Sequence, residues 1–468
     1  MGRTSVLCAT ILATLAWSST ALAVAPQQLT IPMSDGVQLA CSLVEPDGAP
    51  PAGGWPALML FHGLGGTHQQ LLEPLAVQFL APAGYATLEC DARGHGLSGG
   101  LFGLDGPRDV QDTRELFTWL TARPEISDTR IGAYGYSLGG GAVWNAAAAG
   151  VPFKAIAPSI TWTNLKTALQ PQLLAKSGIV QYLALLVPPA RWDPELLAAK
   201  DALTTSEGSS AVTALAASRS VASKLATITT PTFLMQGRHD FLFDVDQALA
   251  AYKALRGPKR LYIGDLGHLP ATNPFAEEVT LAGELVKWFD RYVRGIPNGI
   301  QSQPPVELAH DPWDGKTASY KTLPATKTIS VALPGTATIS GASGKVVRSV
   351  RVTGGPHETF GDSSVTVSYS GAQSWDHLVA VLTIAGDTTP ISLGGIKFAA
   401  ASGTLTINLM NEVVRIPPGK RLTLYLSSTS LAQDPSDALY VTPAQTGAQI
   451  TIGRATLHLS VLARAIAR

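Results

Sequence analysis

The sequence predicts an α/β domain built on a parallel sheet, followed by an all-β sandwich. From about residue 56 to 293, short apolar runs alternate with helical patterns, which is typical of parallel strands joined by helices. Beyond about residue 305, apolar and polar residues alternate in runs such as "SVTVSYS" and "GTLTINL", and Gly, Pro and Ser residues separate these runs. This pattern indicates antiparallel strands. The chain has 468 residues, more than one compact domain usually needs.

The order of elements in the α/β region follows from the same patterns. Buried strands are expected at 57–61, 85–90, 130–134, 153–157, 231–235 and 260–263, and helices at 68–80, 109–122 and 277–294. An Ala/Leu-rich segment at about 164–225 is expected to add helices as a cap over the sheet. The predicted domains are therefore 24–298 for the α/β part with its cap, 299–308 for a Pro- and Gly-rich linker, and 309–468 for the sandwich.

The first 23 residues have the features of a secretory signal peptide. A short basic start precedes an apolar stretch, and Ala21-Leu-Ala23 supplies small residues for cleavage. We expect a secreted or periplasmic protein without stable membrane insertion after cleavage, and a transmembrane anchor is the alternative. Cys8 would be lost with this segment, leaving Cys41 and Cys90 as either a disulfide or two buried thiols.

The charge balance points to small-molecule partners. Lys plus Arg and Asp plus Glu both number 34, so no net field attracts nucleic acid or an anionic membrane. The cysteines lack metal-ligand spacing. We expect neither a cofactor nor a metal.

Ser137 is the predicted nucleophile. It lies in "IGAYGYSLGGGAV", directly after a predicted strand and before the helix-forming "AVWNAAAA". A G-x-S-x-G sequence between strand and helix is a nucleophile elbow, in which a tight turn lifts the serine above the sheet edge. Ser98 also fits G-x-S-x-G, but it lies in a glycine-rich loop with no adjacent helix, so we expect it only to form a turn.

A serine hydroxyl needs a base and an acid that orients the base. His268 and Asp240 each follow a predicted strand late in the α/β region. The order Ser137, Asp240, His268 is the serine, acid, histidine order of the α/β-hydrolase fold. A helix N-cap is the alternative role of Asp240, and Asp244 and Asp265 are weaker candidates for the acid.

Backbone N–H groups are the expected oxyanion donors. His62-Gly-Leu-Gly-Gly66 follows the first buried strand, and this loop can place the N–H of Leu64 beside that of Leu138. The alternative is that these glycines only make a turn.

The chain resembles the X-Pro dipeptidyl peptidase and cocaine esterase (CocE/NonD-like) family of α/β-hydrolases with a C-terminal jelly roll. The stretch "GPRDVQDTRELFTWLTARPEISDTRIGAYGYSLGG" is similar to that family's helix and elbow, and "RIPPGKRLTLYLSSTS" to its jelly roll. The resemblance implies that Ser137 is the nucleophile, Asp240 the acid and His268 the base. Members commonly use a tyrosine as oxyanion donor where this chain reads "HGLGGTH", so a backbone donor at Leu64 is expected instead.

We therefore expect an exported carboxylesterase-like serine hydrolase that acts on a small ester or short peptide. The cap, with Trp162 and Trp192, is expected to cover an apolar pocket for a moderately hydrophobic acyl group. An X-Pro-type exopeptidase is the alternative, with Asp193 or Glu195 holding a free amino group. A carbohydrate- or cell-wall-binding protein with a vestigial hydrolase domain is the alternative from another class, and its candidate surface aromatics are Trp375, Tyr369, Tyr425 and Tyr440.

Overall fold

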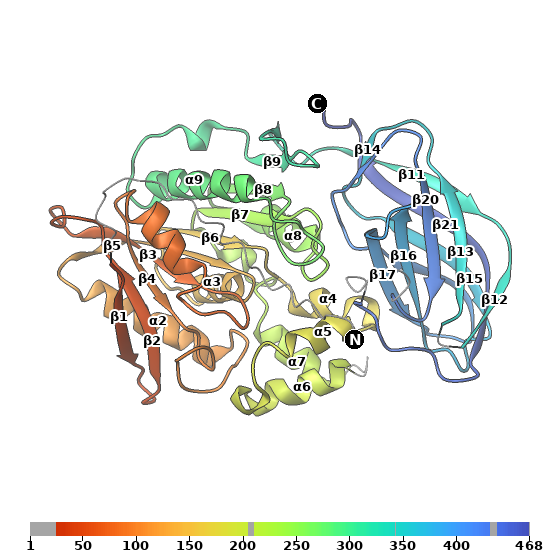
Figure 1. Ribbon diagram of the computed structural model, residues 1–468, viewed down its shortest axis with the longest axis horizontal. Coiled ribbons are helices and arrows are strands. Elements are labelled where there is room, and N and C mark those ends of the chain that lie inside the picture. Colours follow the sequence, from red (N-terminus) through yellow and green to blue (C-terminus); the bar gives the residue numbers. More distant parts are fainter. Residues whose placement is uncertain (1–24, 205–209, 342, 431–437, 468) are drawn as a thin grey trace, which may run out of the picture.

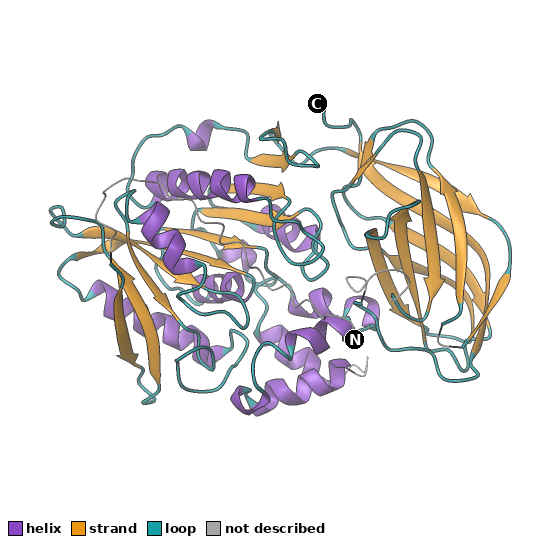
Figure 2. Ribbon diagram, in the orientation of Figure 1, coloured by secondary structure: helices purple, strands orange, loops and turns teal. Residues whose placement is uncertain are grey.

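The computed structural model describes residues 25–204, 210–341, 343–430 and 438–467. The predicted leader at 1–23, with Cys8, lies outside these ranges. An α/β unit on a ten-stranded sheet lies beside a β-sandwich, with a group of short helices at the base of the α/β unit (Figure 1). The same view coloured by secondary structure separates the mixed and the all-β parts (Figure 2). The predicted fold class is confirmed.

The large sheet is parallel in its centre and antiparallel at both ends. Its strands lie in the order β1-β2-β4-β3-β5-β6-β7-β8-β9-β10, and the pairs β1–β2, β2–β4 and β9–β10 are antiparallel. The strands are β1 Gln27–Pro32, β2 Gln38–Val44, β3 Trp55–Phe61, β4 Ala86–Cys90, β5 Ile126–Tyr136, β6 Ala155–Ser159, β7 Thr232–Gly237, β8 Lys259–Gly264, β9 Val306–Ala309 and β10 Thr317–Tyr320. Six predicted strands therefore form the central, parallel part of this sheet, as continuous apolar runs favour.

Helices cover both faces of the sheet and enclose two apolar cores. One face carries α2 (Pro107–Thr121), α3 (Leu138–Ala148) and α8 (Val245–Ala254), and the other carries α9 (Phe275–Tyr292) and the short α1 (Leu72–Leu75) with a π-helical turn, Ala76–Leu80. Alternate residues of one strand enter different cores: Met59 of β3 packs toward α2 and α3, and Leu58 packs toward α9. This is the period of two expected for a strand buried on both faces.

The predicted linker is wrong in part. Residues 306–309 form β9, which pairs in parallel with β8, and β10 then pairs with β9. Val306 and Leu308 are fully buried, so burial against the sheet decides the conformation of a segment whose Pro and Gly content predicted a linker. The α/β sheet thus extends to Tyr320, beyond the boundary predicted at residue 309.

Four short helices form the cap, which lies within the predicted range. They are α4 Leu165–Leu169, α5 Ser177–Leu183, α6 Pro194–Thr204 and α7 Ser210–Ser218. Trp162 and Trp192 are buried in the apolar cluster that joins these helices to Leu138 at the start of α3. The cap therefore packs directly on the part of the sheet where the Ser137 turn lies.

The sandwich consists of two facing antiparallel sheets with an additional short strand pair. One sheet contains β11 Thr326–Leu333, β12 Ala337–Ser340, β15 Ser364–Ser370, β18 Ser402–Asn408 and β21 Gln449–Leu462. The other contains β13 Lys345–Arg351, β16 His377–Ile384, β17 Pro390–Lys397 and β20 Arg421–Ser427, and the additional pair is β14 His357–Glu358 with β19 Arg415–Ile416. Their inward side chains form a separate apolar core, as in packed β-sandwiches.

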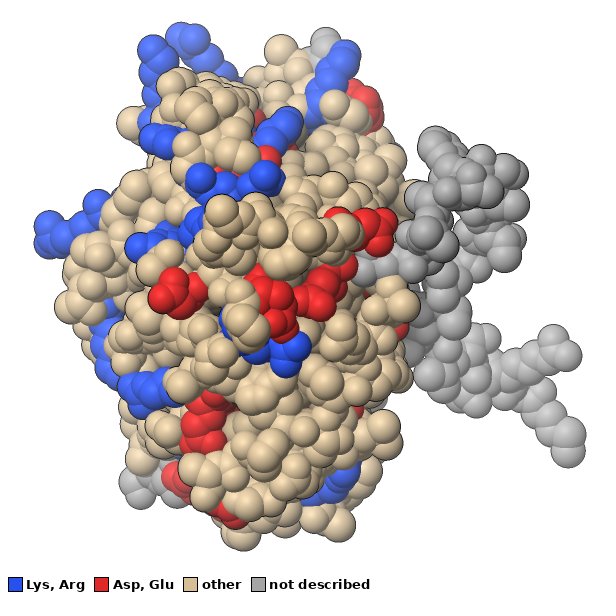
Figure 3. All heavy atoms as spheres, turned by 90° about the vertical axis from the view of Figure 1, so that its left-hand side faces the viewer, with Lys and Arg blue, Asp and Glu red and all other residues tan. Residues whose placement is uncertain are grey.

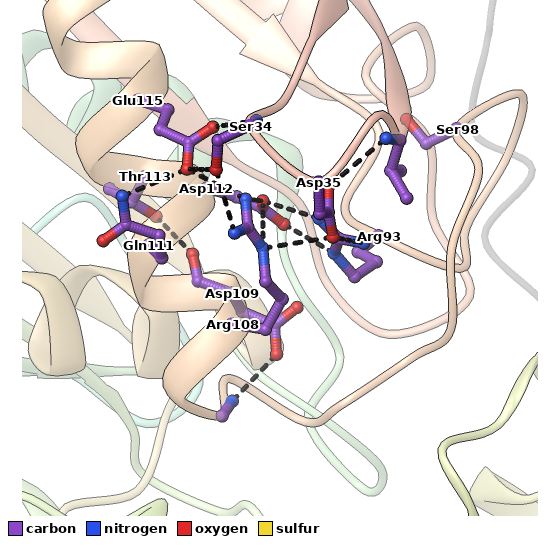
Figure 4. Close-up of polar contacts among 12 residues, drawn as sticks. Ser34, Asp35, Arg93, Ser98, Arg108, Asp109, Gln111, Asp112, Thr113 and Glu115 are labelled. Carbon is purple, nitrogen blue, oxygen red and sulfur yellow. Dashed lines mark hydrogen bonds and ion pairs between the residues drawn. The ribbon is translucent and has the colours of Figure 1, made fainter.

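Two sets of contacts tie the first strands to the rest of the α/β unit. A disulfide joins Cys41 of β2 to Cys90 of β4, so the bridge that the sequence left open is present. In the polar network of Figure 4, Arg93 donates to both oxygens of Asp112 on α2 and pairs with Asp35 in the β1–β2 turn. Arg108 binds Asp112 from the other side. These contacts hold the glycine-rich loop after β4 against α2.

Charged side chains of both signs occur on the face formed by the first strands, separated by broad uncharged areas (Figure 3). This distribution agrees with the zero net formal charge. Across the described ranges, no helix combines the length and the apolar character that a membrane span requires.

We predict that Glu89 makes the stability of the protein depend on pH. Burial in β4 raises the pKa of Glu89 to about 8, so between about pH 4.5 and 8 the folded chain keeps a proton that the unfolded chain releases. The free energy of unfolding must therefore fall as pH rises through this window. Glu89→Gln should abolish this contribution and raise the melting temperature more at pH 8 than at pH 5.5.

Glu115→Gln is the matched control. Although partial burial opposes the effect, hydrogen bonds from Ser34, Gln111 and Arg108 lower the pKa of Glu115 to about 2. Its stabilising contribution is complete above its unfolded pKa, so its substitution should change the melting temperature by the same amount at pH 5.5 and pH 8. Equal shifts at both pH values for Glu89→Gln would contradict the assignment.

Candidate active site

Ser137 lies on a sharp turn between β5 and α3. Its backbone has φ 55° and ψ −120°, an unfavourable conformation for a residue with a side chain. Glycines make the turn possible: a Cβ on Gly135 would lie 2.2 Å from the carbonyl oxygen of Gly139, and a Cβ on Gly139 would lie 2.0 Å from that of Phe61. The turn thus has the geometry of a nucleophile elbow.

His268 connects Ser137 to Asp240. Its Nε2 lies 2.8 Å from Ser137 Oγ, and its Nδ1 lies 2.8 Å from Asp240 Oδ2. The Asp240 carboxylate can only accept a hydrogen bond, so the neutral imidazole carries its proton on Nδ1. Its Nε2 then accepts the hydrogen bond from the serine hydroxyl. The ring of Phe243 packs edge-on against the imidazole, with centroids 5.3 Å apart, and fixes its orientation from the side.

Asp240 follows β7 and is fully buried. Its Oδ1 accepts hydrogen bonds from the N–H groups of Leu242 and Phe243 at 2.9 and 3.0 Å, within a loop that is not helical. The helix N-cap that the sequence offered as the alternative role of Asp240 is wrong, because Asp244 occupies that position at the start of α8. Burial alone would raise the pKa of Asp240, but the charge and hydrogen bond of His268 and the backbone donors hold it below its usual value. The carboxylate therefore stays ionised beside the imidazole.

The loop after β3 packs against the elbow. A Cβ on Gly63 would lie 2.8 Å from the ring of Tyr136 and 3.5 Å from Ser137 Cβ, so the loop backbone approaches Ser137 closely. His62 holds the loop in shape: its Nδ1 donates to the Gly63 carbonyl at 2.7 Å, and its Nε2 accepts from the Ala92 N–H at 2.8 Å. Leu64 and Leu138 belong to one apolar cluster, which places the two predicted donor residues on the same side of the site.

The other serine and carboxylate candidates have structural partners elsewhere. Ser98 Oγ accepts from the Ala40 N–H and donates to the Asp91 carbonyl. Asp244 accepts from the Asn411 N–H at the start of α8, and Asp265 accepts from Thr272. In the ranges that the structure describes, no group of three or more His, Cys, Asp or Glu side chains could hold a metal ion.

Two buried charged residues near Asp240 were not predicted. Glu412, in the sandwich, accepts from the Asp240 N–H at 3.0 Å. Lys176, in the cap, donates to the carbonyls of Phe241 and Leu242 at 2.9 and 3.1 Å. Neither residue lies in a recognisable motif, and Glu412 is 172 positions from Asp240, so no local signal could have indicated these contacts.

An apolar cavity lies inside the cap. Its walls come from α4, α5, α6 and α7, with Leu64 of the oxyanion loop, Phe102 and Trp192 at its edge. No aspartate or glutamate in the described ranges lines it; Lys166, Lys200 and Gln170 are its polar residues. The cavity therefore reaches the loop after β3 through Leu64, whereas Ser137 and His268 do not line it.

The aromatic residues that would support a carbohydrate-binding surface are mostly buried. Trp375 is fully buried, and Tyr440 and Tyr369 are 2% and 9% exposed. Tyr425 is half-buried and packs at the edge of the cluster between the cap and the sandwich. Trp375, Tyr369 and Tyr440 therefore pack inside the protein and offer no exposed ring face on which a sugar could stack.

The sequence and the fold both match known hydrolases. The profile of the X-Pro dipeptidyl-peptidase (S15) family matches residues 35–270. A CocE/NonD family hydrolase from Staphylococcus aureus superposes with a TM-score of 0.71 at 14% identity, covering 92% of this chain and 93% of that one. An α-amino acid ester hydrolase superposes with a TM-score of 0.69, also at 14% identity, covering 98% and 100%.

Two further relatives extend the comparison. An aminopeptidase from a marine sediment archaeon, Thaumarchaeota archaeon, has a TM-score of 0.65 at 14% identity over 97% of this chain and 99% of that one. Among curated sequences, an uncharacterised 31.7 kDa protein from Escherichia coli is 36% identical over 110 residues, which is 23% of this chain and 38% of that protein. At these identities the solved structures establish the shared fold.

We predict that Gly139→Ala disrupts the elbow. The new Cβ would meet the Phe61 carbonyl at 2.0 Å, and because backbone cannot move aside as a side chain can, β3 and α3 must separate. The expected result is a loss of several kcal/mol in the free energy of unfolding, measured by urea denaturation. Gly283→Ala on α9, where nothing lies within 4 Å, is the control and should stabilise by up to about 1 kcal/mol. Similar stability of both variants would contradict this reading of the turn.

Proposed function

The chain belongs to the X-Pro dipeptidyl-peptidase (S15) family of serine hydrolases, and on this premise we propose that it cleaves carboxylic esters through an acyl-enzyme on Ser137. The observation that carries the proposal is the unbroken hydrogen-bond chain from buried Asp240 through His268 to Ser137. Each link has the 2.8 Å spacing that proton transfer to and from a nucleophile requires.

The proposed mechanism is acyl transfer in two steps. His268 Nε2 takes the proton of Ser137 as Oγ attacks the ester carbonyl, and the ionised Asp240 stabilises the imidazolium. The N–H groups of Leu64 and Leu138 are the proposed donors to the oxyanion. His268 then returns the proton to the leaving alcohol, and water repeats the attack on the acyl-enzyme. This chemistry requires neither a metal nor a cofactor.

The cap cavity favours an ester with a hydrophobic acyl group over a peptide with a free amino group. An exopeptidase needs an anion to hold the α-amino group, and no carboxylate in the described ranges lines the cavity. Asp193, one of the two predicted candidates, accepts from the Glu195 N–H at the start of α6. Glu195 is 56% exposed and faces Arg219. The X-Pro exopeptidase therefore remains the second candidate, supported by the family profile.

We also propose that the protein is exported. The leader-like composition of residues 1–23 and the Cys41–Cys90 disulfide both support a secreted or periplasmic location, because disulfides persist in oxidising compartments.

Ser137→Ala should abolish labelling by a fluorophosphonate and lower hydrolysis of p-nitrophenyl acetate by at least about 10³-fold, since the nucleophile is lost. Ser98→Ala should retain both, because its hydroxyl only bonds backbone groups. Labelling and initial rates are measured on the same preparations. Folded wild type that neither labels nor hydrolyses esters would refute the proposed function, and turnover of an X-Pro-nitroanilide in preference to esters would favour the peptidase.

The cavity predicts a preference for longer acyl chains. Each buried methylene contributes about 0.8 kcal/mol, so kcat/KM for p-nitrophenyl esters should rise from acetyl to hexanoyl. Ala199→Phe fills the cavity from α6 and should reduce the octanoyl rate at least about tenfold more than the acetyl rate. Ala250→Phe, on an exposed position of α8, should leave the chain-length profile unchanged. A flat wild-type profile would exclude the cavity as the acyl site.

A further inference from the structure

The loop that carries Asp240 is held by all three parts of the molecule. This segment, residues 238–244 between β7 and α8, is called the acid loop below. It belongs to the α/β unit, but its side contacts come from the cap and from the sandwich segment 409–414 between β18 and β19. In Figure 1 the sandwich lies next to the side of the α/β unit where α8 is found.

A side chain of the sandwich contacts the backbone of Asp240, the proposed acid, directly. Glu412 is 2% exposed, and its Oε2 accepts from the Asp240 N–H at 3.0 Å. Asn411 and Val413, the residues on either side of Glu412, form hydrogen bonds with the acid loop and with the start of α8. Arg238 exchanges backbone and side-chain hydrogen bonds with Val413, and the Val245 N–H donates to the Asn411 carbonyl. The sandwich therefore fixes the backbone of Asp240 directly.

The cap holds the opposite side of the acid loop. The ammonium group of Lys176 is 2% exposed and donates to the carbonyls of Phe241 and Leu242. The N–H of Leu242 donates to Asp240 Oδ1, and the carbonyl of the same residue accepts from Lys176. The lysine and the Asp240 carboxylate therefore both bind the backbone of Leu242. Burial lowers the pKa of Lys176, an effect that the nearby carboxylates of Asp244 and Glu412 oppose.

The surroundings of Glu412 make the burial of its carboxyl group unfavourable. Burial, reinforced by the carboxylates of Asp244 and Asp240, raises the pKa of the Glu412 carboxyl well above its usual value. Burying an acid beside two other carboxylates costs free energy, and only the hydrogen bonds and opposite charges around it offset that cost. The groups that face it are Asp240, Asp244 and Lys176, and its carboxyl group accepts a hydrogen bond from the backbone N–H of Asp240.

We propose that Glu412 and Lys176 are positioning residues that set the geometry of Asp240 against His268, so that the sandwich domain is a working part of the hydrolytic site. The inference rests on the proposed function, because it assigns these residues an effect on the same reaction. Neither residue touches the reacting atoms. Their effect passes through the backbone of the acid loop to the Asp240 carboxylate.

The first test compares Glu412→Ala with Glu412→Gln in the full chain. The alanine variant leaves the Asp240 N–H without its buried acceptor, and we expect kcat per fluorophosphonate-labelled site to fall at least about tenfold with KM nearly unchanged. The glutamine amide oxygen can still accept, so Glu412→Gln should retain most of the wild-type rate. Equal losses in both variants, or none in alanine, would overturn the proposal.

The pH profile separates positioning from simple stabilisation. A misplaced Asp240 carboxylate stabilises the positively charged imidazolium less than a correctly placed one does. The acid limb of kcat/KM should therefore move to lower pH in Glu412→Ala and stay in place in Glu412→Gln. An unmoved limb in the alanine variant would leave Glu412 with a structural role alone and would refute the inference.

Glu358→Ala is the matched control in the same domain. Glu358 is 1% exposed and accepts from Arg415 and from the Ile466 N–H, so its loss should lower the melting temperature without changing kcat per labelled site or the acid limb. A change in kcat there as large as in Glu412→Ala would show that any damage to the sandwich suffices. Wild type that does not label would instead refute the proposed function.

Lys176→Met tests the opposite contact. It removes the donor to two buried carbonyls, and kcat per labelled site should fall by an amount similar to that in Glu412→Ala. Because both residues act on one loop, the double variant should lose less than the product of the two single losses. Independent, multiplicative losses would contradict a shared positioning role.

Discussion

The close approach of two backbones at the elbow is the constraint on which the rest of the site depends. Phe61 at the end of β3 and Gly139 in the first turn of α3 lie so near each other that a single methyl group would not fit. This contact fixes α3 on the sheet and puts the residue before it, Ser137, in its strained conformation. The loop after β3 is drawn to the nucleophile by the same approach, so the turn and the proposed oxyanion donors are one structural unit.

The remaining part of the site is arranged by hydrogen bonds to backbone. Asp240 accepts from three N–H groups, two in its own loop and one of His268, so the carboxylate, the loop and the histidine are held in one arrangement. Ionisable side chains from the cap and the sandwich then engage the loop from outside. Buried ionisable groups of this kind stabilise little by themselves, but their hydrogen bonds specify one geometry.

The sequence allowed the candidate site residues to be predicted because chain order and sheet geometry are sufficient to place them. Ser137, Asp240 and His268 follow β5, β7 and β8, and the carboxyl ends of parallel strands meet at one edge, so their proximity could be predicted. The strand β9 was missed because four residues after a Pro-rich segment carry too little periodicity. Glu412 and Lys176 could not be found, because their roles arise from tertiary contacts over long sequence distances that no single sequence reveals.

The order of these segments along the chain has a consequence for biosynthesis. The acid loop is complete in sequence long before the sandwich segment that contacts it, with 172 positions between Asp240 and Glu412. Contacts of such separation close large loops and form late in folding. A nascent chain that has emerged only as far as α9 therefore contains Ser137, Asp240 and His268 but lacks Glu412, which contacts the backbone of Asp240. Under the proposed positioning role, the site would reach its final geometry only after the sandwich has folded.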